Sequence, residues 1–175
     1  MMVSVSQQAG PKAMNSQPRF VTLMAAIILL VALIDQISKA LMLIWLEPGV
    51  PVPILGDWLR LFLLFNPGAA FSLGQDSTWL FTTIQLTFVV GIAIIAPRIK
   101  DRGSAIGLAM IAGGALGNLI DRLFRDPGFW FGHVVDFISV GRFAVFNIAD
   151  ASITLGVVVF VIAMFAEERR EGKTA

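Results

Sequence analysis

Four long apolar segments constrain this chain more than any other feature, with approximate bounds of 20–46, 78–96, 104–124 and 146–165. A helix needs about 20 mostly apolar residues to cross the hydrocarbon core of a bilayer, and each segment approaches or exceeds that length. Only 14% of the 175 residues are charged, whereas a soluble domain carries about 25%. The sequence therefore predicts an all-α membrane protein with four transmembrane helices.

The distribution of basic residues predicts the orientation of these spans. Eight of them flank the start of the first span, the end of the second and the end of the fourth: Lys12, Arg19, Arg98, Lys100, Arg102, Arg169, Arg170 and Lys173. The other two loops and one span end carry Arg60, Arg122, Arg125 and Arg142. Because short cytoplasmic loops are enriched in Lys and Arg, both termini are expected in the cytoplasm. We accordingly expect a disordered cytoplasmic arm over 1–19, a membrane domain over 20–166 and a cytoplasmic tail over 167–175.

The first outward loop, about 47–77, is expected to fold rather than to act as a plain linker. Pro48, Pro51 and Pro53 keep its beginning extended. Residues 58–65 read either as a β-strand or as an interfacial segment lying on the membrane, and a turn signal follows at 66–68.

The composition excludes several kinds of chemistry. The chain has no cysteine, which excludes thiol catalysis, disulfides and thiolate metal sites. Its single histidine, His133, excludes a multi-histidine metal centre. No basic cluster indicates nucleic acid as a partner, and we expect neither a metal nor a cofactor.

Polar side chains gather at one depth, in the outer third of the membrane, as judged from a helix rise of about 1.5 Å per residue. They are Asp35 and Lys39 of the first span, Asn118, Asp121 and Arg122 of the third, and Asn147 and Asp150 of the fourth. Asp136 approaches the same level from the preceding loop. Because charged groups next to lipid are costly, this convergence predicts a functional site.

Some of these residues also have structural explanations. Asp35 and Lys39 are spaced i, i+4, which favours an ion pair over direct catalysis, and the Lys39 side chain could instead extend outward to the interface. Arg122, at a span end, could be an interfacial anchor. Gly113 and Gly117 form a small-xxx-small pattern, which is typical of close helix packing.

Asp136 and Asp150 are the strongest candidates for chemistry. Apolar neighbours surround Asp136 in the sequence, so desolvation is expected to raise its pKa. Asp150 follows Asn147 by one helical turn, and the two share a face; Asn147 could be a simple helix N-cap, but Asp150 is expected to lie too far inside the helix to cap it. Two neighbouring carboxylates share a proton and can activate water for attack on a carbonyl, which is the chemistry of aspartic peptidases. Proton-coupled transporters also place acids in membranes, so this pattern alone leaves both open.

Four blocks of sequence resemble the lipoprotein signal peptidase (signal peptidase II) family of the bacterial inner membrane. They are D-x-x-x-K at 35–39, N-x-G-A-A-F-S at 66–72, G-N-x-x-D-R at 117–122, and a final pair, V-D-F at 135–137 and F-N-I-A-D at 146–150. The resemblance extends over 34–151. Any one block is modest support, but all four occur in the family's order.

The resemblance implies a four-helix intramembrane aspartic endopeptidase, multi-pass in the bacterial cytoplasmic (inner) membrane, with both termini cytoplasmic. A small extracytoplasmic β-rich cradle would come from the loop at about 47–77, together with a short amphipathic segment, and the active site would face the extracytoplasmic side. The substrates would be prolipoproteins, cleaved just before a diacylglyceryl-modified cysteine. Membrane lipid and globomycin-type peptide inhibitors are the other implied partners.

Roles carried over by position make Asp136 and Asp150 the catalytic pair. The implied substrate-binding residues are Asn66, Asn118, Arg122 and Asn147, and the implied supporting residues are Asp35, Lys39 and Asp121. Asp121 is also the rival of Asp136 for catalysis, and its neighbour Arg122 favours an orienting role. Two other functions stay open, a small proton-coupled membrane transporter and a non-catalytic membrane scaffold. The absence of charge from the cytoplasmic half of every span argues against the transporter.

Overall fold

A computed structural model of the chain describes residues 20–68 and 78–172. Within these residues it has the four predicted long helices and one short 3-10 helix: α1 Val21–Trp45, α2 Thr78–Ile95, η2 Ala96–Arg98, α3 Arg102–Phe124 and α4 Ile148–Glu171. By length and composition, all four long helices could cross a membrane. The predicted bounds agree within two residues, except that α4 continues beyond 165. The predicted arm, 1–19, and the last part of the predicted tail, 173–175, lie outside the described residues.

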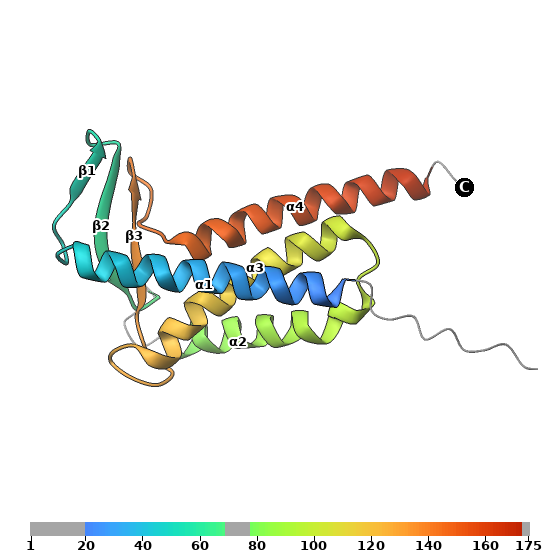
Figure 1. Cartoon of the computed structure of the whole chain (residues 1–175), viewed down its shortest axis with the longest axis horizontal. Coiled ribbons are helices and arrows are strands. Elements are labelled where there is room, and N and C mark those ends of the chain that lie inside the picture. The colour runs from blue at the N-terminus through green and yellow to red at the C-terminus, as the bar shows by residue number, and fades with distance from the viewer. Residues whose placement is uncertain (1–19, 69–77, 173–175) are drawn as a thin grey trace, which may run out of the picture.

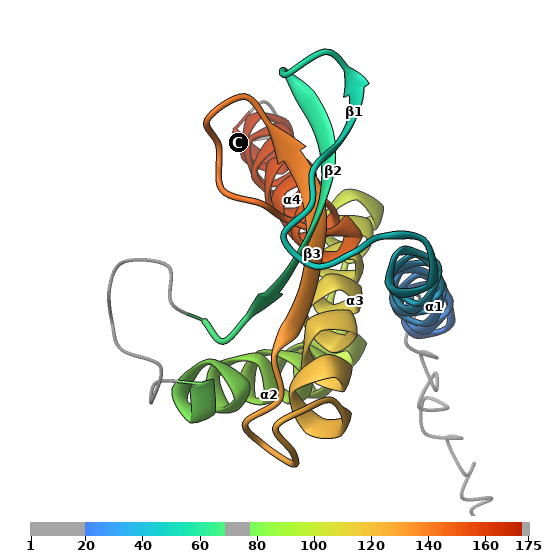
Figure 2. The same cartoon turned by 90° about the vertical axis from the view of Figure 1, so that its left-hand side faces the viewer.

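Helix α3 is the centre of the bundle, with α1, α2 and α4 arranged around it (Figure 2). In its most apolar stretch 72% of the residues are buried, against 11–17% in the other three helices. Small residues make this possible: a Cβ built on Gly107 would lie 2.7 Å from the backbone nitrogen of Phe160 in α4, and one on Gly113 would lie 2.8 Å from Cβ of Val31 in α1. The packing role predicted for Gly113 is therefore confirmed, and Gly117 likewise faces α1 at Asp35.

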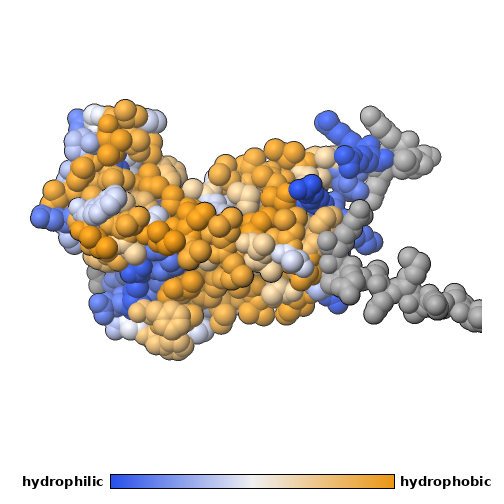
Figure 3. All heavy atoms as spheres, in the orientation of Figure 1, coloured by the Kyte–Doolittle hydropathy of each residue, from blue (hydrophilic) through white to orange (hydrophobic). Residues whose placement is uncertain are grey.

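The outer surface of the bundle suits a lipid environment. Apolar side chains cover the helices as a continuous band, and hydrophilic residues gather at its two ends (Figure 3). Large exposed side chains on this band include Leu29 and Leu33 of α1, Ile84 of α2 and Ile162 of α4. A surface of this kind is stable only when hydrocarbon covers it.

A three-stranded antiparallel sheet lies across one end of the bundle. Its strands, in spatial order, are β1 Val52–Leu55, β2 Leu59–Asn66 and β3 Val134–Val140. Helix α1 begins, and helix α4 ends, at the opposite end (Figure 1). The strand interpretation of 58–65 is confirmed. Residues 69–77, which complete this loop and hold the A-A-F-S part of one motif, lie outside the described residues.

Strand β3 differs from the prediction, which places Asp136 in a loop before the fourth span. The sheet is therefore built from the loop after α1 and the loop after α3, and not from the first of these loops alone. Strand β3 pairs with β2, and the register places Leu64 opposite Asp136 and Asn66 opposite Val134. This pairing fixes Asp136 in a buried position on the sheet, next to the end of the helix bundle.

Candidate active site

Asp136 lies on β3 with its side chain fully enclosed, 1% exposed. Asn66 is diagonal to it across the strand pair, close enough for a long side chain to reach. The amide Nδ2 of Asn66 donates to Oδ2 of Asp136 at 2.8 Å, and Nδ2 of Asn147 donates to Oδ1 at 2.7 Å. Both carboxyl oxygens of Asp136 therefore have amide partners.

Asp150 is fixed at the beginning of α4 by a capping box. Asn147 is the N-cap; its Oδ1 accepts the backbone N–H of Asp150 at 3.0 Å, and Oδ2 of Asp150 accepts the backbone N–H of Asn147 at 3.2 Å. The expectation that Asp150 lies too far inside the helix to cap it is wrong, because the third helical residue can reach back to the N-cap. The carboxylate of Asp150, a candidate catalytic group, therefore also caps helix α4.

Asn118 of α3 connects the two acids. Its Nδ2 donates to Oδ1 of Asp150 at 2.8 Å, and its Oδ1 accepts Nδ2 of Asn147 at 3.0 Å. Since Asn147 also donates to Asp136, the two carboxylates are joined through a pair of side-chain amides. The sequence prediction that these four residues meet in one site agrees with this geometry.

Lys39 is buried beneath the site and pairs with two acids. Its Nζ lies 2.7 Å from Asp35 and 2.8 Å from Asp121, and it donates to Oδ1 of Asn118 at 2.8 Å. The predicted ion pair with Asp35 is present, whereas the alternative in which Lys39 extends outward is wrong. By bonding to Oδ1 of Asn118, Lys39 orients the amide group of Asn118 toward Asp150.

Asp121 uses both of its carboxyl oxygens within the protein. Oδ1 accepts from Arg125 at 2.6 Å and from Gln36 at 3.0 Å, while Oδ2 pairs with Lys39 and accepts the backbone N–H of Val135 at 3.2 Å. An acid with four such partners has little capacity to bind and activate water. Its contacts therefore support the orienting role rather than the catalytic one.

Asp35, on α1, contacts the beginning of α4. Its Oδ1 accepts the backbone N–H of Ala149 at 2.9 Å, next to Asp150, so Asp35 helps to cap α4. Gln36 and Arg125, which sequence reasoning did not single out, support Asp121. Gln36 lies within a motif block, but nothing in the sequence indicated that Arg125 would turn inward.

Arg122 is buried and points into the protein, so the interfacial anchor is not its role. Its guanidinium carbon lies 5.7 Å from the ring centroid of Phe81, and Nη1 donates to the carbonyl of Pro67 at 3.4 Å. Its Nε is buried without a hydrogen-bond partner among the described residues. The charge of Arg122 acts on both Asp136 and Asp150.

The environment of Asp136 changes its acidity as the sequence predicted. Burial raises the pKa of Asp136 from 3.8 to about 7. The negative charge of Asp150 adds to this rise, while the hydrogen bonds from Asn66 and Asn147 oppose it. Asp136 therefore keeps its proton to a much higher pH than an exposed aspartate does.

Asp150, in contrast, borders open space. A cavity of about 560 Å³ is lined by Asp150, Thr154 and Leu155 of α4 and by 143–146 of the preceding loop. A carboxylate on a cavity wall can be reached by water and substrate. In the part of the chain that the structure describes, no cluster of His, Cys, Asp and Glu is arranged to hold a metal ion.

Comparisons with known proteins show which family this chain resembles. A sequence model of the family described as "Signal peptidase (SPase) II" matches residues 27–166. The lipoprotein signal peptidase of Rhodococcus jostii is 42% identical over 90% of this chain and 78% of its own length. The lipoprotein signal peptidase of Mycobacterium avium is 46% identical over 83% of this chain and 80% of its own length. That of Mycobacterium tuberculosis H37Rv is 43% identical over 88% of this chain and 76% of its own length.

Solved structures share the fold. One, described as a bacterial membrane enzyme, has a TM-score of 0.74 at 26% identity and covers 87% of this chain and 93% of its own. A second, also described as a bacterial membrane enzyme, has a TM-score of 0.73 at 27% identity and covers 85% of this chain and 96% of its own.

Proposed function

The chain belongs to the signal peptidase II family, and we propose that Asp136 and Asp150 are the catalytic acids with which it removes signal peptides from prolipoproteins. It is thus a multi-pass membrane protease, and the aspartic mechanism is our assignment. The observation that carries this assignment is the position of Asn147, which hydrogen-bonds to both carboxylates. Two acids held this close can share one proton.

The environments of the two acids suggest which of them holds the proton. Asp136, enclosed and with a pKa of about 7, keeps the proton and acts as the general acid. Asp150, on the cavity wall, acts as the base and takes a proton from the attacking water. The water oxygen bonds to the scissile carbonyl carbon as the proton of Asp136 moves to the carbonyl oxygen. The C–N bond then breaks as Asp150 returns its proton to the leaving amine, and Asp136 recovers its own as the carbonyl re-forms.

The remaining site residues divide into two groups. Asn118 and Asn147 donate and accept within the site, which supports a role in positioning the acids. Two residues are better placed to bind the substrate backbone: Arg122, whose buried Nε has no hydrogen-bond partner among the described residues, and Asn66, which donates to Oδ2 of Asp136. Asp35, Lys39 and Asp121 support the two acids from below.

The membrane setting follows from the same proposal. We place the sheet on the extracytoplasmic side of the bacterial inner membrane and the two termini in the cytoplasm. The support is that the segment from α2 to α3 and the last turns of α4 lie at the end opposite the sheet, and these segments hold the described basic residues Arg98, Lys100, Arg102, Arg169 and Arg170. The substrate would bring its diacylglyceryl-modified cysteine to the acids from the lipid. Globomycin-type peptides would compete for the cavity beside Asp150. Neither a transporter nor a scaffold is favoured, because the relatives are peptidases.

The test is cleavage of a diacylglyceryl-modified preprotein by purified protein in detergent, followed by gel shift. Asp136→Asn and Asp150→Asn should each lower kcat by about 10²- to 10⁴-fold, the usual contribution of general acid–base catalysis. Asp57→Asn is the matched control, since Asp57 is an exposed acid in the turn between β1 and β2, and it should cleave at the normal rate. Normal cleavage by either site variant would refute the assignment.

A further inference from the structure

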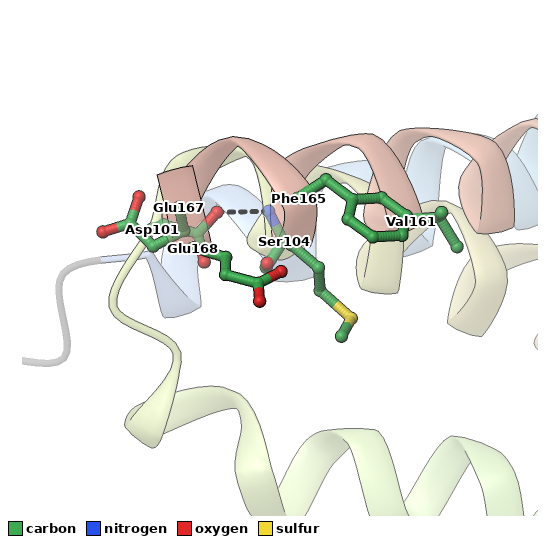
Figure 4. A pocket seen from close by; sticks show the side chains of 7 residues that line it. Asp101, Ser104, Val161, Phe165, Glu167 and Glu168 are labelled. Carbon is green, nitrogen blue, oxygen red and sulfur yellow. Dashed lines mark hydrogen bonds between the residues drawn. The ribbon is translucent and has the colours of Figure 1, made fainter. Parts of the chain in front are cut away.

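One face of α4 connects the candidate active site to a second cavity at the far end of the bundle. The first cavity holds Asp150 and Thr154. The second, of about 550 Å³, is lined by Val161, Met164, Phe165, Glu167 and Glu168 of α4 and by Asp101 and Ser104 at the beginning of α3 (Figure 4). Both cavities open along the same helix.

Helical periodicity makes the surface between them continuous. Residues three or four positions apart lie above one another on a helix, so the α4 face consists of Asp150, Thr154, Val158, Val161, Phe165 and Glu168. Its apolar members are uncovered: Val158 is 50% exposed, Val161 41% and Phe165 61%. Asp150 and Glu168 are 18 positions apart, which corresponds to about 27 Å along the helix.

The far end of this face is acidic. Asp101, Glu167 and Glu168 are the charged residues among the described residues that line the second cavity, and Lys and Arg are absent from its lining. Their carboxylates gather at one end of the cavity, beyond the Phe165 and Val161 side chains (Figure 4). Arg169 and Arg170 follow Glu168 directly in the sequence. Because successive residues of a helix are about 100° apart around its axis, their side chains project from other sides of α4 than the α4 face.

The three carboxylates differ in their protein partners. Asp101 caps α3, its Oδ1 accepting the backbone N–H of Ser104 at 2.7 Å. Glu167 lies 3.8 Å from Arg170. Glu168 forms no ion pair with another described residue, so its charge is available to a cationic ligand.

We propose that the α4 face receives the substrate's signal peptide as a helix, with its basic amino-terminal segment at the carboxylates of the second cavity. This inference rests on the proposed function and extends it to substrate selection. A signal peptide has a positively charged n-region, an apolar h-region of about 7–15 residues and a short cleavage segment of about three. As a helix, the last two parts span roughly 15–27 Å. With the scissile bond at Asp150, the positive charges fall beside Glu168.

The experiment uses the full chain in non-ionic detergent, where anionic lipid cannot attract the n-region. Two diacylglyceryl-modified preproteins differ only in the n-region, which carries two Lys in one and two Glu in the other. Wild-type protein should have the lower KM for the Lys form, with the same kcat for both. Glu168→Lys should raise KM for the Lys form by about threefold, as expected for one exposed charge pair, and lower it for the Glu form.

The matched control is Asp57→Lys, which changes the net charge equally but lies at the sheet end, and it should leave the KM ratio of the two preproteins at the wild-type value. An unchanged ratio in Glu168→Lys, or an equal fall in kcat for both preproteins, would overturn the inference while leaving the peptidase assignment intact. Failure of the wild-type protein to cleave either preprotein would instead refute the proposed function, and the inference with it.

Discussion

Asn147 donates its side-chain Nδ2 to Oδ1 of Asp136 at 2.7 Å, across the space between the start of α4 and strand β3. The Oδ1 of the same amide accepts the backbone N–H of Asp150 at 3.0 Å and caps the helix. One amide group therefore sets both the beginning of α4 and the position of an acid on the sheet. These two roles can be separated by mutation.

Asn147→Ser should keep the fold and lose part of the activity. Serine is nearly as good an N-cap as asparagine, so the loss of stability should come only from the buried amide contacts with Asp136 and Asn118, about 1–3 kcal/mol. It has no Nδ2 to reach Asp136, which is neutral when it holds its proton, and a hydrogen bond between neutral groups is worth about 0.5–1.5 kcal/mol, so kcat should fall by about 2- to 10-fold. Asn147→Ala, which removes the cap as well, should cost about a further 1 kcal/mol of stability. Full activity in the serine variant would show that the bridge is dispensable.

The pKa of Asp136 predicts the alkaline limb of the pH profile. The general acid must hold its proton, so kcat/KM should decline as pH rises through about 7. Because the hydrogen bond from Asn66 lowers this pKa, Asn66→Ala should move the limb to higher pH, whatever its effect on the maximal rate. Rates measured from pH 5 to pH 9 in both proteins test this. A limb that stays in place or moves to lower pH contradicts the assignment of the proton to Asp136.

The same group should make the protein less stable at high pH. The folded pKa of Asp136 is raised, so the folded state binds the proton more tightly than the unfolded chain between pH 3.8 and about 7. The associated stability is complete below pH 3.8 and is lost as pH rises through about 7, a change on the order of 4 kcal/mol. Other acids titrate in this range, so the measurement is the difference in melting temperature between wild type and Asp136→Asn at each pH. This difference should shift in favour of the variant as pH rises, and a difference independent of pH contradicts the prediction.

Lys39 should be the residue on which folding of the site depends most. Lys39→Met leaves Asp35 without a cation and Asp121 with Arg125 alone, and removing one partner of a buried ion pair costs about 3–5 kcal/mol. Arg125→Met is the matched variant, because Arg125 also pairs with Asp121 but its side chain is 26% exposed, and water can replace it. Thermal unfolding in detergent should show the larger loss for Lys39→Met. Equal losses of stability in the two variants would mean that the burial of the ion pair does not determine how much its removal destabilises the protein.

The helices could be predicted from the sequence because lipid imposes their length and composition. In a bilayer, the backbone N–H and C=O groups of an apolar segment must form hydrogen bonds within the segment. Long apolar runs with so few charges therefore form helices. Strand β3 could not be predicted in the same way. Its partner β2 is about 70 positions away, and a seven-residue apolar run beside a span does not reveal that pairing.

The members of the site were predictable, but their contacts were not. The motif blocks and the helix rise together predict that Asp35, Asn118 and Asp150 lie at one depth in the membrane. The inward course of Lys39, and the bond from Ala149 to Asp35 across 114 positions, depend on how α1 and α4 pack on α3. Sequence periodicity gives the face of each helix, but hydrogen-bond partners between faces are set by tertiary structure.

Gly114 of α3 should limit how precisely Asp150 is held. A Cβ built there would collide with the carbonyl oxygen of Ala149 and lie 2.7 Å from Cγ1 of Ile153, so Gly114→Ala must push the first turn of α4 away. We expect a loss of about 1–3 kcal/mol in stability and a lower kcat, because Asp150 moves relative to Asn118. Gly91→Ala in α2, where no atom lies within 4 Å of the new Cβ, should instead be neutral or more stable by up to about 1 kcal/mol, with normal activity. Wild-type kcat in Gly114→Ala would mean that the approach of α3 to α4 does not position the acid.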